Sequence, residues 1–71
     1  MEIKKGRYRH FKGRVYDVVG SATNSETLEE VIVYRSAEDG TLWVRPASMW
    51  NETVARDGKL MPRFTLLEES D

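Results

Sequence analysis

The residues best suited to binding a ligand are aromatic and basic, and several of them fall on neighbouring predicted strands. Trp43 and Arg45 are two positions apart, so they share one face of a strand. If Leu42 and Val44 face the core, Trp43 and Arg45 point outward, with Tyr34 of the preceding strand beside them. An exposed indole next to guanidinium groups would stack on a planar ligand and hold its negative charge. The alternative is that the tryptophans belong to the core and the arginines lie over them.

Two other groups of polar residues carry weaker signals. His10 is the only histidine in the chain; alone it makes neither a triad nor a metal site, and a structural or surface role is the alternative. Residues 25–30 combine hydroxyls with carboxylates, which can transfer protons or hold a hard cation. Strand alternation sets Glu26 and Thr27 on opposite sides, so these groups need not converge. Ordinary polar turns have the same composition.

These observations define a predicted ligand-binding set, with no predicted catalytic residue, metal ligand or cofactor. The set comprises Arg9, His10, Glu26, Thr27, Tyr34, Trp43, Arg45 and Arg63. Its guanidinium groups would supply charge and planar hydrogen bonding, and its rings would supply stacking. The same residues could instead form a buried, salt-bridged network that stabilises the fold. The sequence leaves both interpretations open.

Short strands separated by turns are expected to position these residues. Two Asp-Gly pairs, at 39–40 and 57–58, predict hairpin turns because glycine accepts a positive φ. A polar loop is expected over 21–27, and Ser48 is expected to cap a helical turn over 49–54. β-Branched and aromatic residues predict the extended segments. These segments are 14–19, 28–35 (the central strand), 41–45, 59–61 and 63–67, and alternation places Tyr8 and His10 on one face ahead of them.

This pattern predicts an all-β domain, a small five-stranded SH3-like or OB-like barrel with one short helical turn. A chain of 71 residues allows a single domain over 1–71, with an ordered core over 6–67. The absence of cysteine argues against disulfides, zinc ribbons and thiol nucleophiles. No apolar leader or membrane-length run is present, so a cytoplasmic location and no membrane partner are expected.

The net charge of −1 conceals an uneven distribution along the chain. Residues 1–16 contain six basic residues and one acidic residue, whereas residues 17–41 contain one basic and six acidic. The basic arm can pack beside the acidic middle so that the two fields cancel. Alternatively, it meets an anion such as phosphate or nucleic acid.

A combination of short motifs resembles the DUF1653 family, short bacterial proteins of uncharacterised function. The motifs are Gly6-Arg7-Tyr8-Arg9-His10-Phe11-Lys12-Gly13, Tyr16, Ala22, Ser25-Glu26-Thr27, Val33-Tyr34-Arg35, Trp43-Val44-Arg45-Pro46, Met49-Trp50 and Pro62-Arg63-Phe64. Asn24 stands where family members often carry histidine, and Trp50 where they often carry phenylalanine. The resemblance implies a bacterial, compact, β-rich domain and brings no established activity with it.

Three functions follow from these residues. The first is a non-enzymatic binding module for an anionic or aromatic ligand, such as a nucleotide or single-stranded nucleic acid. The second is a protein-interaction domain of SH3-like type, with a groove made by exposed Trp50 and Met49 next to Pro46. The third is a small hydrolase using His10 and Glu26, which the shallow depth of so small a domain disfavours. The oligomeric state is left undetermined by the sequence.

Overall fold

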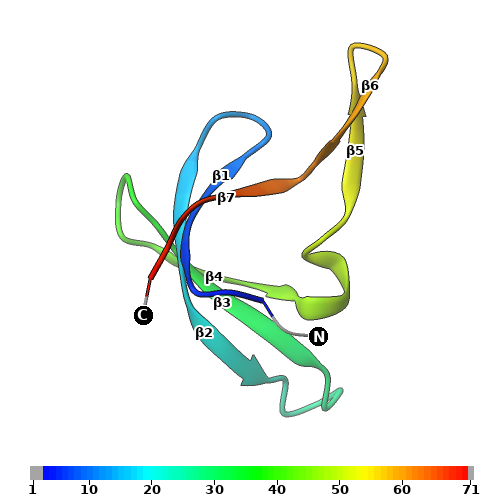
Figure 1. Cartoon of the computed structure of the whole chain (residues 1–71). Helices are drawn as coiled ribbons and strands as arrows, with labels where there is room; N and C mark the ends of the chain where they lie inside the picture. Colours follow the sequence, from blue (N-terminus) through cyan, green and yellow to red (C-terminus); the bar gives the residue numbers. More distant parts are fainter. Residues whose placement is uncertain (1–2, 71) are drawn as a thin grey trace.

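The structure of the chain, a computed structural model, describes residues 3–70 and is mainly β, as the sequence predicts (Figure 1). The elements in chain order are β1 (Gly6–His10), β2 (Val15–Thr23), β3 (Glu30–Ser36), β4 (Leu42–Pro46), the 3-10 helix η1 (Ala47–Met49), β5 (Thr53–Arg56), β6 (Lys59–Pro62) and β7 (Phe64–Glu69). The five predicted strand segments correspond to β2, β3, β4, β6 and β7, and β1 and β5 are additional strands.

Five strands form one antiparallel sheet in the order β4-β3-β2-β1-β7, while β5 and β6 pair only with each other. The predicted closed barrel is not confirmed, because β4 and β7 are the two edges of this sheet. After β4 the chain enters η1 and then the β5–β6 hairpin, which projects away from the sheet in Figure 1. The sheet is strongly curved, so that one face is concave.

Both Asp-Gly turns are confirmed. Gly40 ends the turn between β3 and β4 with a φ of 76°. In the β5–β6 hairpin, Asp57 and Gly58 have φ values of 53° and 76°. Positive φ at both central residues is the conformation of a type I′ turn, whose twist matches that of the flanking strands. These local signals were sufficient to locate both hairpins.

Two local predictions were wrong. The 3-10 helix covers 47–49 rather than 49–54, and its N-cap is Pro46, with no side-chain cap from Ser48. The polar segment predicted as a loop over 21–27 belongs to β2 as far as Thr23, because Ser21 to Thr23 pair with β3. Gly20 does not end β2: a register shift between Val18 and Gly20 lets the strand continue. Tertiary pairing thus overrides the polar composition of this segment.

The core lies on the concave face and is rich in aromatic rings. Trp50, directly after η1, is only 1% exposed, and it stacks on Phe64 with ring centroids 4.1 Å apart. Tyr8 and Tyr34 meet the indole edge-on, at 5.4 and 5.2 Å. The alternative that Trp50 is a core residue is therefore correct, and the predicted interaction groove that required an exposed Trp50 is wrong.

Candidate anion-binding site

The register of β3 and β4 decides where Trp43 and Arg45 point. Tyr34 is the cross-strand partner of Trp43, and Ile32 is the partner of Arg45. Directly paired residues of antiparallel strands share a face of the sheet. Because Tyr34 and Ile32 are buried in the core, Trp43 and Arg45 lie on the concave side. The prediction that they point away from the core was wrong.

The residues that face away on β4 are Leu42 and Val44, which are 55% and 62% exposed. Trp43 on the concave side is itself 50% exposed. On this edge strand Leu42, Trp43 and Val44 are all at least half exposed, so the hydrophobicity of its residues does not reveal which face is the inner one. The indole is thus accessible, as predicted, although it lies on the opposite face of the strand.

Arg45 and Arg63 converge on one carboxylate, that of Glu52. Arg45 Nη2 lies 3.4 Å and Arg63 Nε 3.6 Å from Glu52 Oε1. The two guanidinium side chains are 23% and 26% exposed. Their Nε atoms are shielded from solvent and have no hydrogen-bond partner among the described residues. Two partly buried cations therefore share a single counter-charge and keep unused hydrogen-bonding capacity.

Backbone hydrogen bonds hold Arg63 in this position. Its N–H donates to the Glu52 carbonyl oxygen at 2.9 Å, and its own carbonyl oxygen accepts from the Phe11 N–H at 2.9 Å. Arg63 lies between β6 and β7. It therefore joins the base of the β5–β6 hairpin to the turn between β1 and β2. The convergence of Arg45, Arg63 and Glu52 depends on this junction.

Aromatic rings line the concave face beside the two arginines. The Tyr34 ring lies 5.2 Å from that of Tyr16 and 5.7 Å from that of Phe64, both edge-on. Burial raises the pKa of Tyr34, and Arg45 opposes that shift through its charge and a hydrogen bond to the phenol. Tyr34 and Arg45, both predicted site residues, are thus brought into contact.

His10 lies above these rings. Its centroid is 5.1 Å from Phe64, 6.4 Å from Tyr16 and 4.5 Å from Phe11. Its Nδ1 accepts a hydrogen bond from the Lys12 N–H at 3.2 Å. The proton of the neutral ring therefore sits on Nε2, which can donate one hydrogen bond. Burial lowers the pKa of His10, and the nearby positive charges of Arg63, Lys12 and Arg45 lower it further.

Three cations lie close to the ring of Phe11, an arrangement that the sequence did not predict. Lys12 Nζ and the Cζ atoms of Arg56 and Arg63 lie 5.8, 5.9 and 5.7 Å from its centroid. Arg56 Nη1 also donates to the Phe11 carbonyl oxygen at 3.0 Å. The negative faces of an aromatic ring attract cations at such distances. Phe11 thus helps to hold three like charges close together.

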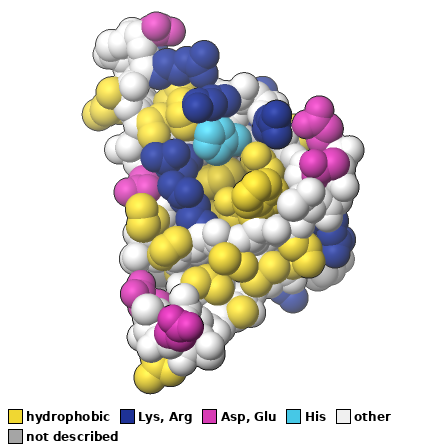
Figure 2. All heavy atoms as spheres, turned by 180° about the vertical axis from the view of Figure 1, so that it is seen from behind, with side chains coloured by type: hydrophobic (Ala, Val, Ile, Leu, Met, Phe, Trp, Pro, Cys, Tyr) yellow, Lys and Arg dark blue, Asp and Glu magenta, His cyan; other side chains and the backbone are white. Residues whose placement is uncertain are grey.

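Figure 2 shows the resulting surface. The single histidine side chain lies among basic side chains, above a recessed patch of hydrophobic side chains. Sequence reasoning placed His10, Tyr34, Arg45 and Arg63 in this site but missed Phe11, Tyr16, Glu52 and Arg56. Phe11 and Glu52 lie between strands, where no periodicity indicates the direction of a side chain. The interleaving of basic and aromatic residues in 7–12 was the only available signal for Phe11.

The remaining predicted site residues lie elsewhere. Glu26 and Thr27 belong to the loop between β2 and β3, whereas His10 precedes the turn at the other end of β2 (Figure 1). Asn24 Oδ1 accepts from the N–H groups of Glu26 and Thr27, at 2.9 and 3.3 Å, and so orders this loop. The geometry gives no support to a hydrolase that uses His10 and Glu26 together. Arg9 is exposed on the outer face of β1, facing away from the Arg45–Arg63 pair.

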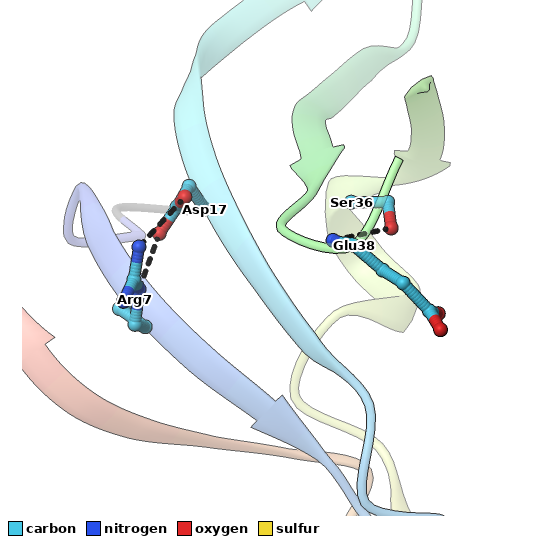
Figure 3. A network of polar contacts seen from close by, with 4 residues as sticks. All are labelled: Arg7, Asp17, Ser36 and Glu38. Carbon is cyan, nitrogen blue, oxygen red and sulfur yellow. Dashed lines mark hydrogen bonds and ion pairs between the residues drawn. The ribbon is translucent and has the colours of Figure 1, made fainter. Parts of the chain in front are cut away.

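Much of the basic arm is neutralised by carboxylates. Arg7 of β1 forms a two-pronged contact with Asp17 of β2, with Nε to Oδ1 at 2.9 Å (Figure 3). Arg14 lies 3.9 Å from Glu38, whose N–H donates to Ser36 Oγ in the adjacent turn. For these pairs, the basic arm does pack beside the acidic middle of the chain, so that opposite charges cancel. The positive excess is left around His10 and Phe11.

Among residues 3–70, no group of three or more histidine, aspartate or glutamate residues is arranged to hold a metal ion. No helix within residues 3–70 is long and apolar enough to cross a membrane.

The architecture defines a class: a small, mainly β domain built on an open antiparallel sheet, with a cationic and aromatic surface at one end. The chain belongs to the DUF1653 family, described as proteins of unknown function, whose family model matches residues 6–66. A crystal structure of a DUF1653 protein from Bordetella bronchiseptica is 36% identical in sequence, with a TM-score of 0.85. The match covers 99% of this chain and 94% of that chain. No curated protein matches the chain. The family resemblance predicted from the motifs is thus confirmed.

Proposed function

We propose that this protein is a non-enzymatic binding module for a ligand that combines negative charge with a planar aromatic group, such as a nucleotide. The observation that carries the proposal is the meeting of Arg45 and Arg63 on the single carboxylate of Glu52. One carboxylate cannot neutralise two guanidinium groups. An anion placed beside them would gain charge-assisted hydrogen bonds in a partly desolvated setting.

The rings next to this pair support a ligand with an aromatic part. Tyr34 and His10 adjoin the arginines, and the half-exposed Trp43 lies next to Tyr34 on β4. Of these rings, those of His10 and Trp43 are accessible and can stack on a base of any kind, whereas Tyr34 is buried in the core. The neutral His10 ring adds one N–H donor. Charge and stacking would then act on different parts of the same molecule.

Binding of thymidine 5′-monophosphate tests the proposal, with thymidine and inorganic phosphate as its two separate halves. We expect the nucleotide to bind more tightly than either half at low salt, measured by calorimetry or by chemical-shift titration. Binding should weaken as salt is raised, because the contact is electrostatic. Absence of nucleotide binding at low salt, or equal affinity for thymidine, would contradict the proposal.

Matched variants separate the site from general surface charge. Arg45→Gln should weaken nucleotide binding about tenfold, since a charged hydrogen bond contributes about 1.5 kcal/mol or more. Arg35→Gln is the control: it removes the same charge from an exposed position of β3 on the outer face. Equal losses in both variants would show that only net charge matters.

Glu52→Gln provides a test with the opposite sign. Removing the carboxylate that competes for Arg45 and Arg63 should strengthen nucleotide binding while it lowers the stability of the fold. A purely structural ion-pair network would lose stability and gain no affinity. Weaker nucleotide binding by a folded Glu52→Gln variant would therefore contradict the assignment of this site.

A further inference from the structure

A groove adjoins the proposed site where the turn between β1 and β2 faces β6 and β7. It has a volume of about 440 Å³, and its lining includes Arg9, His10, Phe11, Lys12, Met61 and Thr65. None of the described residues that line it is acidic. Arg9 faces away from Arg45 and Arg63 on the outer face of β1. It nevertheless lines this groove together with His10.

His10 and Phe11 connect this groove to the Arg45–Arg63 pair. Arg9 and His10 are neighbours on β1, so their side chains leave opposite faces of the sheet. The charge of Arg45 and Arg63 reaches the imidazole from the concave side. Lys12 Nζ and Arg63 Cζ also lie 5.8 and 5.7 Å from the centroid of the Phe11 ring, so this ring contacts a cation of the groove and a cation of the arginine pair. His10 and Phe11 therefore link the Arg45–Arg63 pair to Arg9 and Lys12 of the groove.

We propose that the groove extends the nucleotide site into a path for single-stranded nucleic acid. One phosphate lies at Arg45 and Arg63, the strand passes His10 and Phe11, and a following phosphate lies at Arg9 and Lys12. This inference rests on the proposed function, because it uses the same arginine pair for the first phosphate.

The alternation of cations and rings favours a strand over other anionic partners. Proteins that bind single strands combine a positive groove along the backbone with aromatic side chains on which bases stack. A mononucleotide would engage one cationic centre and leave the other unused. An acidic peptide would satisfy the charges but would make no use of the two rings. A single strand carries a phosphate and a base at every nucleotide, so it can contact both the cations and the rings.

Comparison of thymidine 5′-monophosphate with a thymidylate hexamer tests the path. Fluorescence anisotropy of labelled hexamer, competed with each unlabelled ligand, gives the affinities on one scale. We expect the hexamer to bind at least about tenfold more tightly than the monophosphate at low salt, because it adds a second set of charge-assisted contacts. Equal affinities would overturn the path and leave the nucleotide site standing. Failure of both ligands would overturn the proposed function itself.

Single substitutions assign the second phosphate. Lys12→Gln should weaken binding of the hexamer by a larger factor than binding of the monophosphate, and should lower the hexamer's slope of log affinity against log salt by about 0.7. Arg45→Gln should weaken both ligands, and Arg35→Gln should change neither. If Lys12→Gln affects both ligands equally or neither of them, the groove is not the path.

A glutamate hexamer provides the charge-matched comparison. The strand proposal requires this peptide to bind much more weakly than the thymidylate hexamer at the same salt concentration. Equal binding of the two hexamers would show that the surface selects charge alone, and would overturn the assignment of nucleic acid as the partner.

Discussion

At the scale of single residues, the site is governed by the cost of keeping positive charges together. Lys12, Arg56 and Arg63 surround the ring of Phe11, and Arg45 and Arg63 share Glu52. The aromatic face and the carboxylate reduce their mutual repulsion without removing it. A bound anion would relieve what remains. The same field acts on His10, whose burial and cationic neighbours all favour its neutral form.

His10 should therefore make the stability of the fold depend on pH. Because folding lowers its pKa, the unfolded chain binds the proton more readily, and stability falls as pH drops below about 6.5. The decline should level off once pH is below the folded pKa. Urea unfolding between pH 7.5 and 5.5, measured by circular dichroism, gives the slope.

The control for this measurement is His10→Gln, which is expected to be less stable at every pH but to show a flatter slope. His10 is the only histidine in the chain, and no other side chain has an unperturbed pKa in this interval. A slope unchanged by the substitution would contradict the assignment of the pH dependence to His10.

At the scale of elements, the tight approach of β1 and β7 depends on Gly6. A Cβ atom at this position would overlap the carbonyl oxygen of Glu68 in β7 and lie 2.9 Å from the Cα of Glu69. The φ of Gly6 is 149°, a conformation that L side chains rarely adopt. The register of β1 and β7 also shifts between Arg7 and Tyr8. Glycine here lets β7 run close enough to place Phe64 beside His10.

Gly6→Ala should destabilise the domain by about 2 kcal/mol, because a packed backbone must move to admit the methyl group. Gly40→Ala is the matched control: a Cβ there meets nothing within 4 Å, so only the positive φ of 76° is strained. We expect about 1 kcal/mol for the control. Chemical denaturation of both variants measures the difference, and a loss at Gly6 no larger than that at Gly40 would show that β7 adapts freely.

At the scale of the whole molecule, one aromatic cluster joins the sheet to η1. Trp50 contacts Tyr8 from β1, Tyr34 from β3 and Phe64 from β7. A domain of this size is stable by roughly 4 to 10 kcal/mol. A single large core side chain therefore accounts for a considerable share of the margin. The site depends on the same cluster, since its aromatic floor includes Tyr34 and Phe64.

The two tryptophans should respond very differently to truncation. Trp50→Ala should cost about 3 to 5 kcal/mol, through lost burial and the cavity that remains, and should bring the domain close to unfolding. Trp43→Ala should cost about 1 kcal/mol or less, because its side chain is half exposed at an edge strand. Thermal and urea unfolding of the two variants compare them. Similar losses would contradict the assignment of Trp50 to the core and Trp43 to the surface.

The sequence by itself determined the mainly β class, the two Asp-Gly hairpins, the shared face of Tyr8 and His10, and the family. These properties are local: φ preferences, alternation and short motifs act over a few residues. The tertiary structure decided that the sheet stays open, that Trp43 and Arg45 face the concave side, and that Glu52 joins Arg45 to Arg63 while Glu26 lies at the far end. Such features depend on strand register and on turns between distant segments, for which the sequence carries no periodic signal.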